Sequence, residues 1–287
     1  MAVYRQDYRR YEGPLTDPRW RFMVLPRYFL GQVFQSRFFT LFFVICLAVP
    51  VGAALGIYFT HNVNALRALH VRVDRLIPID ERFFLGLLSI QSSFGFLMSA
   101  IVGPGLISPD LANNALPLYL SRPFSRAEYV LGKMSILVIL LSLITWIPAL
   151  LLFGLQWSLE GNVWMLENLR IAAAILVDSC IWITTVSLLA LALSAWVKWR
   201  PVAGALLFGV FFAGAGFGEA INNILYTKWG YLINLAALME TIATWLFLGL
   251  ESPKWIPVWS ACLSLLAVCG ICLLLLAQRV RACEVVK

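Results

Sequence analysis

The sequence predicts an all-α integral membrane protein with six transmembrane helices, and three observations lead to that prediction. Apolar residues make up 61% of the 287 residues, charged residues only 13%, and the mean hydropathy is +0.83. Soluble domains carry about 45–50% apolar and about 25% charged residues. The apolar residues are also gathered into blocks, each long enough to cross a bilayer core as a helix of roughly 20 residues. The composition therefore excludes a disordered chain, a disulfide scaffold and a soluble enzyme.

Long apolar blocks with few or no charged residues define the predicted spans. Six blocks are long enough, at residues 38–59, 83–107, 134–159, 171–197, 201–222 and 255–278. The block at 171–197 contains one charged residue, Asp178, and the block at 201–222 contains Glu219. The other four contain none.

A seventh apolar stretch, residues 229–250, is weaker because it holds Asn234, Glu240, Thr241 and Thr244. Basic residues decide whether it crosses. The first 37 residues carry seven arginines and the last nine residues carry three basic side chains, so both ends favour the cytoplasm. We therefore predict an even number of spans, six, in the cell inner or plasma membrane with both termini cytoplasmic. Residues 229–250 then form a re-entrant or interfacial hairpin before the last span, which is tolerated where protein covers it.

Residues 18–37 mix aromatic and other apolar residues with four arginines. This pattern predicts an amphipathic helix that lies in the cytoplasmic interface and is broken at Pro26. The alternative is an ordinary basic flank with aromatic residues at the membrane surface. Residues 1–37 are thus expected to form a cytoplasmic tail with an interfacial helix, and residues 38–287 a single six-span domain.

No catalytic or nucleotide-binding motif is present in the sequence. Gly132 and Lys133 resemble the end of a phosphate-binding loop, but Ala127 stands at the earlier glycine position and Met134 at the Ser or Thr position. We expect no enzyme activity and no cofactor or metal site in this chain, so its energy must come from a partner or a gradient. The net charge of +7 is explained by basic flanks of the apolar blocks rather than by a nucleic-acid partner.

Four polar residues are predicted at or near membrane depth: Asp178, Thr185, Glu219 and Glu240. A carboxylate in the bilayer costs about 2.5–3.5 kcal/mol on insertion scales, so it needs a partner or water. Asp178 and Thr185 border one seam of the fourth span, where Asp178 is either a pathway residue or an interhelical hydrogen-bonding group. Glu219 and Glu240 fall near the outer interface, where they either mark the membrane boundary or contribute to a pathway.

Small residues four positions apart occur in two spans, as Gly52 and Gly56 and as Gly214 and Gly218. Such pairs let helices approach closely, either within one chain or between two chains. The sequence leaves both possibilities open.

The loop between the second and third spans is the most informative segment. A turn and a helix N-cap are predicted at residues 108–110, followed by a short helix over residues 111–120 with apolar residues at helical spacing. Residues 121–126 turn the chain again, and Ser125 forms a capping box with Glu128 at the start of the next helix. A semi-apolar helix between two spans is typical of a docking element.

At this point the chain resembles the ABC-2 type transporter permeases. Their loop has the pattern Glu-x-x-x-Gly-Thr-Leu, then two Leu, then Pro-x-Ser-Arg, then Gly-Lys. The corresponding residues here are Asp110, Asn114, Ala115, Leu116, Leu118, Leu120, Pro123, Ser125, Arg126, Gly132 and Lys133. The spacing matches throughout, while Asp110 replaces Glu, and Asn114 and Ala115 replace Gly and Thr, as in a divergent subfamily.

The resemblance implies the permease subunit of an ATP-driven exporter that works by alternating access. A second permease chain, two ABC ATPase subunits that hold ATP and Mg²⁺, and membrane lipid are the implied partners. The loop then acts as the coupling helix. Its predicted contacts with the ATPase are Asp110, Asn114, Leu116, Tyr119, Leu120, Arg122, Pro123, Phe124, Ser125 and Arg126.

Two other functions compete with this interpretation. A membrane scaffold that transports nothing would explain the scarcity of charge inside the spans. A gradient-driven transporter would predict inverted repeats with broken spans in corresponding places, and the sequence shows no convincing repeat.

Overall fold

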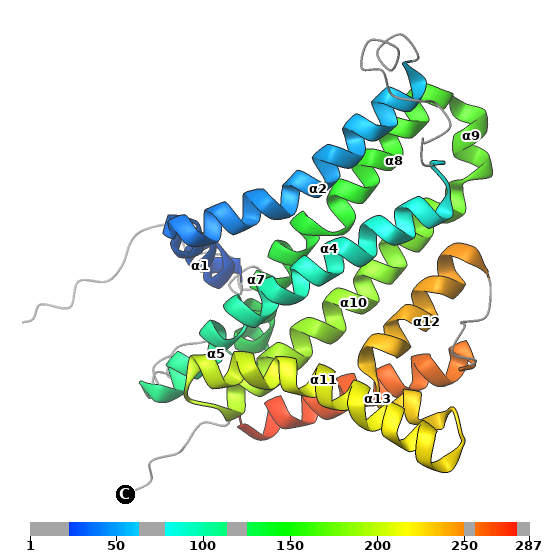
Figure 1. Cartoon of the computed structure of the whole chain (residues 1–287). Helices are drawn as coiled ribbons and strands as arrows, with labels where there is room; N and C mark the ends of the chain where they lie inside the picture. Colours follow the sequence, from blue (N-terminus) through cyan, green and yellow to red (C-terminus); the bar gives the residue numbers. More distant parts are fainter. Residues whose placement is uncertain (1–22, 63–77, 114–124, 250–255, 280–287) are drawn as a thin grey trace, which may run out of the picture.

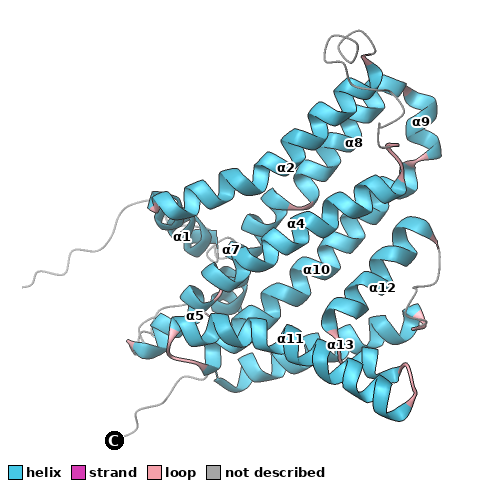
Figure 2. Ribbon diagram, viewed as in Figure 1, coloured by secondary structure: helices cyan, strands magenta, loops and turns pink. Residues whose placement is uncertain are grey.

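The computed structural model describes residues 23–62, 78–113, 125–249 and 256–279, and all regular secondary structure in these residues is helical (Figures 1 and 2). Six helical segments are long and apolar enough to cross a membrane, which confirms the predicted six-span, all-α class. These spans are α2 (Arg37–His61), α4 (Glu81–Val102) with α5 (Pro104–Ala112), α7 (Arg126–Ile144) with α8 (Trp146–Glu160), α10 (Leu169–Trp196), α11 (Arg200–Leu225) and α13 (Val258–Arg279).

Four shorter helices complete the described residues. They are α1 (Val24–Gln35), α9 (Asn162–Glu167), the 3₁₀ helix η3 (Trp229–Leu232) and α12 (Leu235–Leu248). In Figure 1, α10 runs through the middle of the bundle, and it packs against α4, α5, α7, α11, α12 and α13. Among the spans, α10 is the most buried and α2 the least.

Close contacts between α10 and the second span form the centre of the bundle. A Cβ atom on Gly95 would lie 2.8 Å from the ring of Trp182, and one on Gly103 would lie 2.9 Å from the Cβ of Ala190. Small residues at these crossings let the two backbones approach, as is usual between membrane helices.

The second span continues further than the sequence predicted. The expected turn and N-cap at residues 108–110 is wrong, because α5 runs through Pro109 to Ala112. Instead of forming a turn, Ser108 makes hydrogen bonds to Ser194 of α10. Its Oγ donates to the carbonyl of Ser194 at 2.9 Å, and its amide donates to Ser194 Oγ at 3.0 Å. Ser194 Oγ also accepts from the amide of Ile107 at 3.1 Å. The helix restarts at Pro104, and amide groups near a helix start lack carbonyl partners within the helix. Ser194 Oγ supplies an acceptor for two of them, the amides of Ile107 and Ser108.

Helix α1 packs against α7 at one end of the bundle. Phe29, Leu30 and Val33 lie against the core, while its polar side chains are exposed. Pro26 falls in the first turn, where a missing amide is tolerated, so the predicted break at Pro26 is wrong. The structure has a helix over Val24–Gln35 with one side against the core, and an interfacial position in a membrane stays a prediction.

After α11 the chain turns back along the same helix. Tyr226 adopts a left-handed conformation with φ of 51° and ends α11. A Cβ atom on Gly218 would lie 2.6 Å from the carbonyl oxygen of Gly230, so η3 packs directly against α11. The side chain of Asn222 fixes this contact by accepting from the amide of Gly230 at 2.8 Å.

Helix α12 then leads away from α11 and packs among α4, α10 and α13 (Figure 1). Its 14 residues extend about 21 Å, which is too short for a full span. The hairpin geometry agrees with the expected return of the chain, and its depth in a membrane stays a prediction. Gly214 and Gly218 pack against the hairpin of the same chain. A Cβ atom on Gly214 would lie 2.8 Å from the carbonyl oxygen of Ile233, much as one on Gly218 would meet Gly230.

The first span begins on the same side of the bundle as the last span ends. In Figure 1, α1 and the start of α2 lie at the left, as does the end of α13. The guanidinium of Arg279 lies 5.7 Å from the ring centre of Trp196 at the end of α10. This arrangement fits an even number of spans, and which side is cytoplasmic stays a prediction from the basic residues.

Candidate functional site

The candidate site is the predicted coupling segment, residues 110–126. Three of its ten predicted contact residues, Asp110, Ser125 and Arg126, lie in the described part of the chain. The remaining contacts lie outside the described residues and stay predictions: Asn114, Leu116, Tyr119, Leu120, Arg122, Pro123 and Phe124. What the structure describes is the frame that holds the segment at both of its ends.

The first end is held by Asp110, near the C-terminus of α5. Its Oδ2 accepts a hydrogen bond from the hydroxyl of Tyr129 at 2.6 Å and lies 2.9 Å from the Nζ of Lys133. Both partners come from the N-terminal part of α7. The Asp110 carboxylate therefore joins α5 to α7 across the segment that connects them.

This junction is largely removed from solvent. Tyr129 is fully buried, and the side chains of Lys133 and Asp110 are only 7% and 15% exposed. The ammonium of Lys133 also lies 5.6 Å from the ring centre of Tyr129, within reach of a cation–π interaction. Because a buried charge without its partner is costly, Asp110 and Lys133 hold each other in place. The contact of Asp110 with a partner protein stays a prediction.

The second end is held by the predicted capping box, which the structure confirms. The amide of Glu128 donates to Ser125 Oγ at 3.2 Å, and the amide of Ser125 donates to Glu128 Oε2 at 2.6 Å. Arg126 follows as the first residue of α7, with an exposed side chain. The start of α7 is therefore fixed where the coupling segment joins it.

Tyr129 and Lys133 are the site residues that the sequence interpretation missed. It took Lys133 only as part of a Gly-Lys pair and as a basic flank. Their spacing of four residues places both on one face of a helix, and Asp110 is the acidic residue of the preceding loop. That combination was the available signal for a buried ion pair.

The predicted intramembrane residues lie on three helices. Asp178 is half-buried on α10 and makes no hydrogen bond or ion pair with the described residues. Thr185, also on α10, is buried and donates to the carbonyl of Ile181 at 2.8 Å. Glu219 on α11 and Glu240 on α12 are exposed on the protein surface. A role for any of these residues in a transport path stays a prediction.

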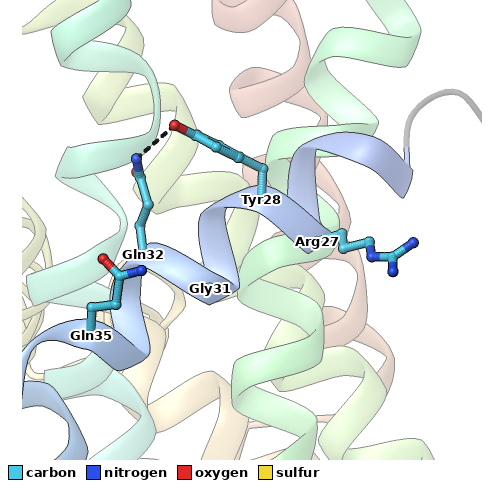
Figure 3. Close-up of a pocket in the computed structure, with 5 residues that line it drawn as sticks. All are labelled: Arg27, Tyr28, Gly31, Gln32 and Gln35. Carbon is cyan, nitrogen blue, oxygen red and sulfur yellow. Dashed lines mark hydrogen bonds between the residues drawn. The ribbon is translucent and has the colours of Figure 1, made fainter.

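A shallow groove of about 570 Å³ runs along the exposed side of α1. It is lined by Arg27, Tyr28, Gly31, Gln32 and Gln35. Figure 3 shows Tyr28 and Gln32 joined across one helical turn, with Gln32 Nε2 donating to the Tyr28 hydroxyl at 3.1 Å, while Arg27 extends to the side. This polar face lies at the same end of the bundle as the coupling segment, because α1 packs on α7.

The sequence profile of the ABC-2 family transporter proteins matches residues 31–277. The chain belongs to this family. The match takes in the whole hairpin and all of the first five spans, so membership rests on much more than the coupling motif. No curated protein sequence matches the chain. An ABC-2 permease is a multi-pass membrane component of an ABC transporter, and its general partner is an ABC ATPase.

Proposed function

We propose that this ABC-2 permease is the transmembrane subunit of an exporter that two ATPase subunits drive by alternating access. ATP and Mg²⁺ are held by the ATPase, and the permease contributes the path and the coupling segment. The observation that carries the proposal is the buried junction of Asp110 with Tyr129 and Lys133, which fixes the segment to two spans at once.

Force applied to the coupling segment has a direct route into the bundle. On one side the segment continues into α7, which begins at the Ser125 capping box. On the other side it continues into α5, which hydrogen bonds of Ser108 and Ile107 attach to Ser194 of α10. Closure of the ATPase would thus move α5, α7 and the central helix together rather than bend a loose loop.

A second permease chain, identical or closely related, completes the membrane unit. The exposed side of α11 offers small residues at helical spacing for this contact: Gly209, Ala213, Gly216 and Ala220. Cβ atoms on Gly209 and Gly216 would meet nothing within 4 Å, as is also true of Gly52 and Gly56 on α2. Surfaces of this kind let membrane helices pack closely.

The side that carries the coupling segment is proposed to be cytoplasmic, in the cell inner or plasma membrane. Basic residues at this end include Arg126, Lys198, Arg200 and Arg279, which agrees with the positive-inside rule. Asp178 and Thr185, and at the outer end Glu219 and Glu240, remain the proposed polar positions along the path.

Co-expression with a candidate ABC ATPase subunit tests the proposal. We expect the two proteins to purify together and the reconstituted complex to hydrolyse ATP with a rate that transported compounds raise. Lone permease with no ATPase partner, but with transport driven by an imposed ion gradient, would favour a gradient-driven transporter. A stable complex with no ATP-dependent transport of any compound would favour the scaffold.

A further inference from the structure

A second surface of the bundle carries features that the transport cycle does not explain. A groove of about 490 Å³ runs between the second span and α11. One wall is formed by Leu97, Ile101 and Pro104, and the other by Gly204, Ala205 and Phe208. Several of these side chains are exposed, so the groove opens on the outer surface of the described bundle.

The floor of the groove is a close helix crossing. A Cβ atom on Gly204 would lie 2.8 Å from the carbonyl oxygen of Ala100, so α11 and α4 touch there without side chains between them. The walls rise on both sides as apolar side chains. The resulting groove is open to the outside and its lining is mostly apolar, which suits a hydrocarbon chain.

One end of the groove is basic. Arg200 lines it, and Lys198 lies two residues earlier in the turn between α10 and α11. Both side chains are exposed, and neither makes an ion pair or hydrogen bond within the described part of the chain. Two neighbouring positive charges, with no partner among the described residues, at the end of an apolar groove indicate an anionic ligand with a hydrocarbon tail.

Exposed tryptophans place this end at the membrane surface. Trp196 and Trp199 flank the turn, and Trp199 is 75% exposed. Tryptophan gathers at the level of the lipid headgroups, and Arg279 stands beside Trp196 at the same level. Basic pockets between spans on the cytoplasmic side are suited to lipid phosphates.

We infer that this groove binds one anionic phospholipid, with an acyl chain between α4 and α11 and the phosphate at Lys198 and Arg200. A second copy of the chain would fit the same place less well, because it would need carboxylates opposite the two cations. The described carboxylates at this end are already engaged, Asp110 by Lys133 and Glu128 by the amide of Ser125.

Native mass spectrometry of the purified full chain tests this assignment, with phosphatidylglycerol and phosphatidylcholine of identical acyl chains as the probes. We expect one phosphatidylglycerol retained per chain, with at least tenfold weaker retention of phosphatidylcholine. Lys198→Gln with Arg200→Gln should weaken phosphatidylglycerol at least tenfold, and Ala205→Trp should abolish retention of both lipids by filling the groove.

Matched controls separate the site from general effects. Arg126→Gln removes an exposed arginine at the same end, and Leu206→Trp places the same indole side chain at the neighbouring residue, outside the groove. Both should retain phosphatidylglycerol as the wild type does. Equal retention of the two lipids, or unchanged retention in the Lys198 and Arg200 variant, would overturn the headgroup assignment. Dissociation of a permease dimer by Ala205→Trp, with lipid retention unchanged, would show that the groove is an interface between copies.

Discussion

Arg170 on α10 caps the far end of the hairpin helix by donating from Nε to the carbonyl oxygen of Leu246 at 3.1 Å. Its Nη2 donates to the carbonyl oxygen of Trp245 at 3.0 Å. Carbonyl groups at the end of a helix have no partner within the helix, and a cation there also complements the helix dipole. Gly249 follows with φ of 66°, and a Cβ atom on it would lie 2.9 Å from Arg170 Nη2. The guanidinium therefore ties α12 to the central span.

Replacing this arginine should loosen the hairpin. For Arg170→Gln we expect the local stability of α12 to fall by about 1.5–3 kcal/mol at most for each charged hydrogen bond removed. The carbonyl of Leu246 loses its charged donor, and the carbonyl of Trp245 keeps only the amide of Gly249. Hydrogen exchange should rise over residues 235–248 in particular. Arg82→Gln, an exposed arginine at the start of α4, is the control and should leave that exchange unchanged. Equal exchange in both variants would show that the cap does not hold α12.

The second prediction tests the close contact between Gly218 of α11 and Gly230 of η3. In Gly218→Ala, a Cβ atom would lie 2.6 Å from the carbonyl oxygen of Gly230, a backbone atom that can move only if η3 moves. We expect a lower thermal unfolding temperature in detergent. Gly86→Ala is the matched control, since nothing lies within 4 Å of its Cβ position, and alanine favours a helix by roughly 0.5–1 kcal/mol over glycine. A stabilised Gly218→Ala would contradict the packing of η3 on α11.

The attachment of α5 to the central helix can be tested at Ser194. Ser194→Ala removes the acceptor of the amides of Ile107 and Ser108 inside the protein, and a buried group left without a partner costs about 1–3 kcal/mol. Thermal unfolding in detergent should report this loss. Ser93→Ala, which removes only a hydroxyl that donates to the carbonyl of Ser89 in the same helix, should change little.

The sequence predicted those features that depend on residues close together in the chain. Long apolar blocks with at most one charged residue located all six spans, and Ser125 with Glu128 located the start of α7. The basic residues at the two ends, with the weak stretch at 229–250, predicted a returning hairpin. In each case the physical cause lies within one block of sequence or in the sum of its charges.

Features that depend on distant partners were missed or wrong. The turn predicted at residues 108–110 was wrong because Ser194, 86 residues further along the chain, takes the hydrogen bonds of Ser108. The engagement of Asp110 with Tyr129 and Lys133 could not be derived from the motif, since the motif places Asp110 on a docking helix. A break was predicted at Pro26, but a proline in the first turn of a helix does not break it. Pro26 lies in that turn because α1 begins at Val24, which the sequence did not indicate.

Topology can be tested with single cysteines in a background without the native ones. Asn162→Cys, at the start of α9, should react with a membrane-impermeant reagent added outside intact cells. Arg122→Cys, in the coupling segment, should react only after permeabilisation, as should a cysteine retained at position 283. Labelling of position 283 from outside would contradict the six-span prediction, and labelling of position 122 from outside would reverse the proposed orientation.

The last prediction concerns the ion pair that frames the coupling segment. Lys133→Met should be strongly destabilising, by about 3–5 kcal/mol, because it leaves the Asp110 carboxylate without its charge partner in a site with little solvent. Asp110→Asn alone removes the carboxylate that lies 2.9 Å from the ammonium of Lys133 and should also destabilise, whereas the two changes together should cost less than their sum. Thermal unfolding of the four proteins measures this coupling, with Arg126→Gln as the control for loss of a positive charge nearby.

The same four proteins test whether the pair matters for transport. Because the pair joins α5 to α7 on either side of the segment, the double variant should fold and still bind the ATPase. Its ATP hydrolysis should respond less to transported compounds, since force on the segment is no longer delivered to both spans. If the double variant keeps full stimulation, the pair contributes to stability alone, and coupling must run through α7 without α5.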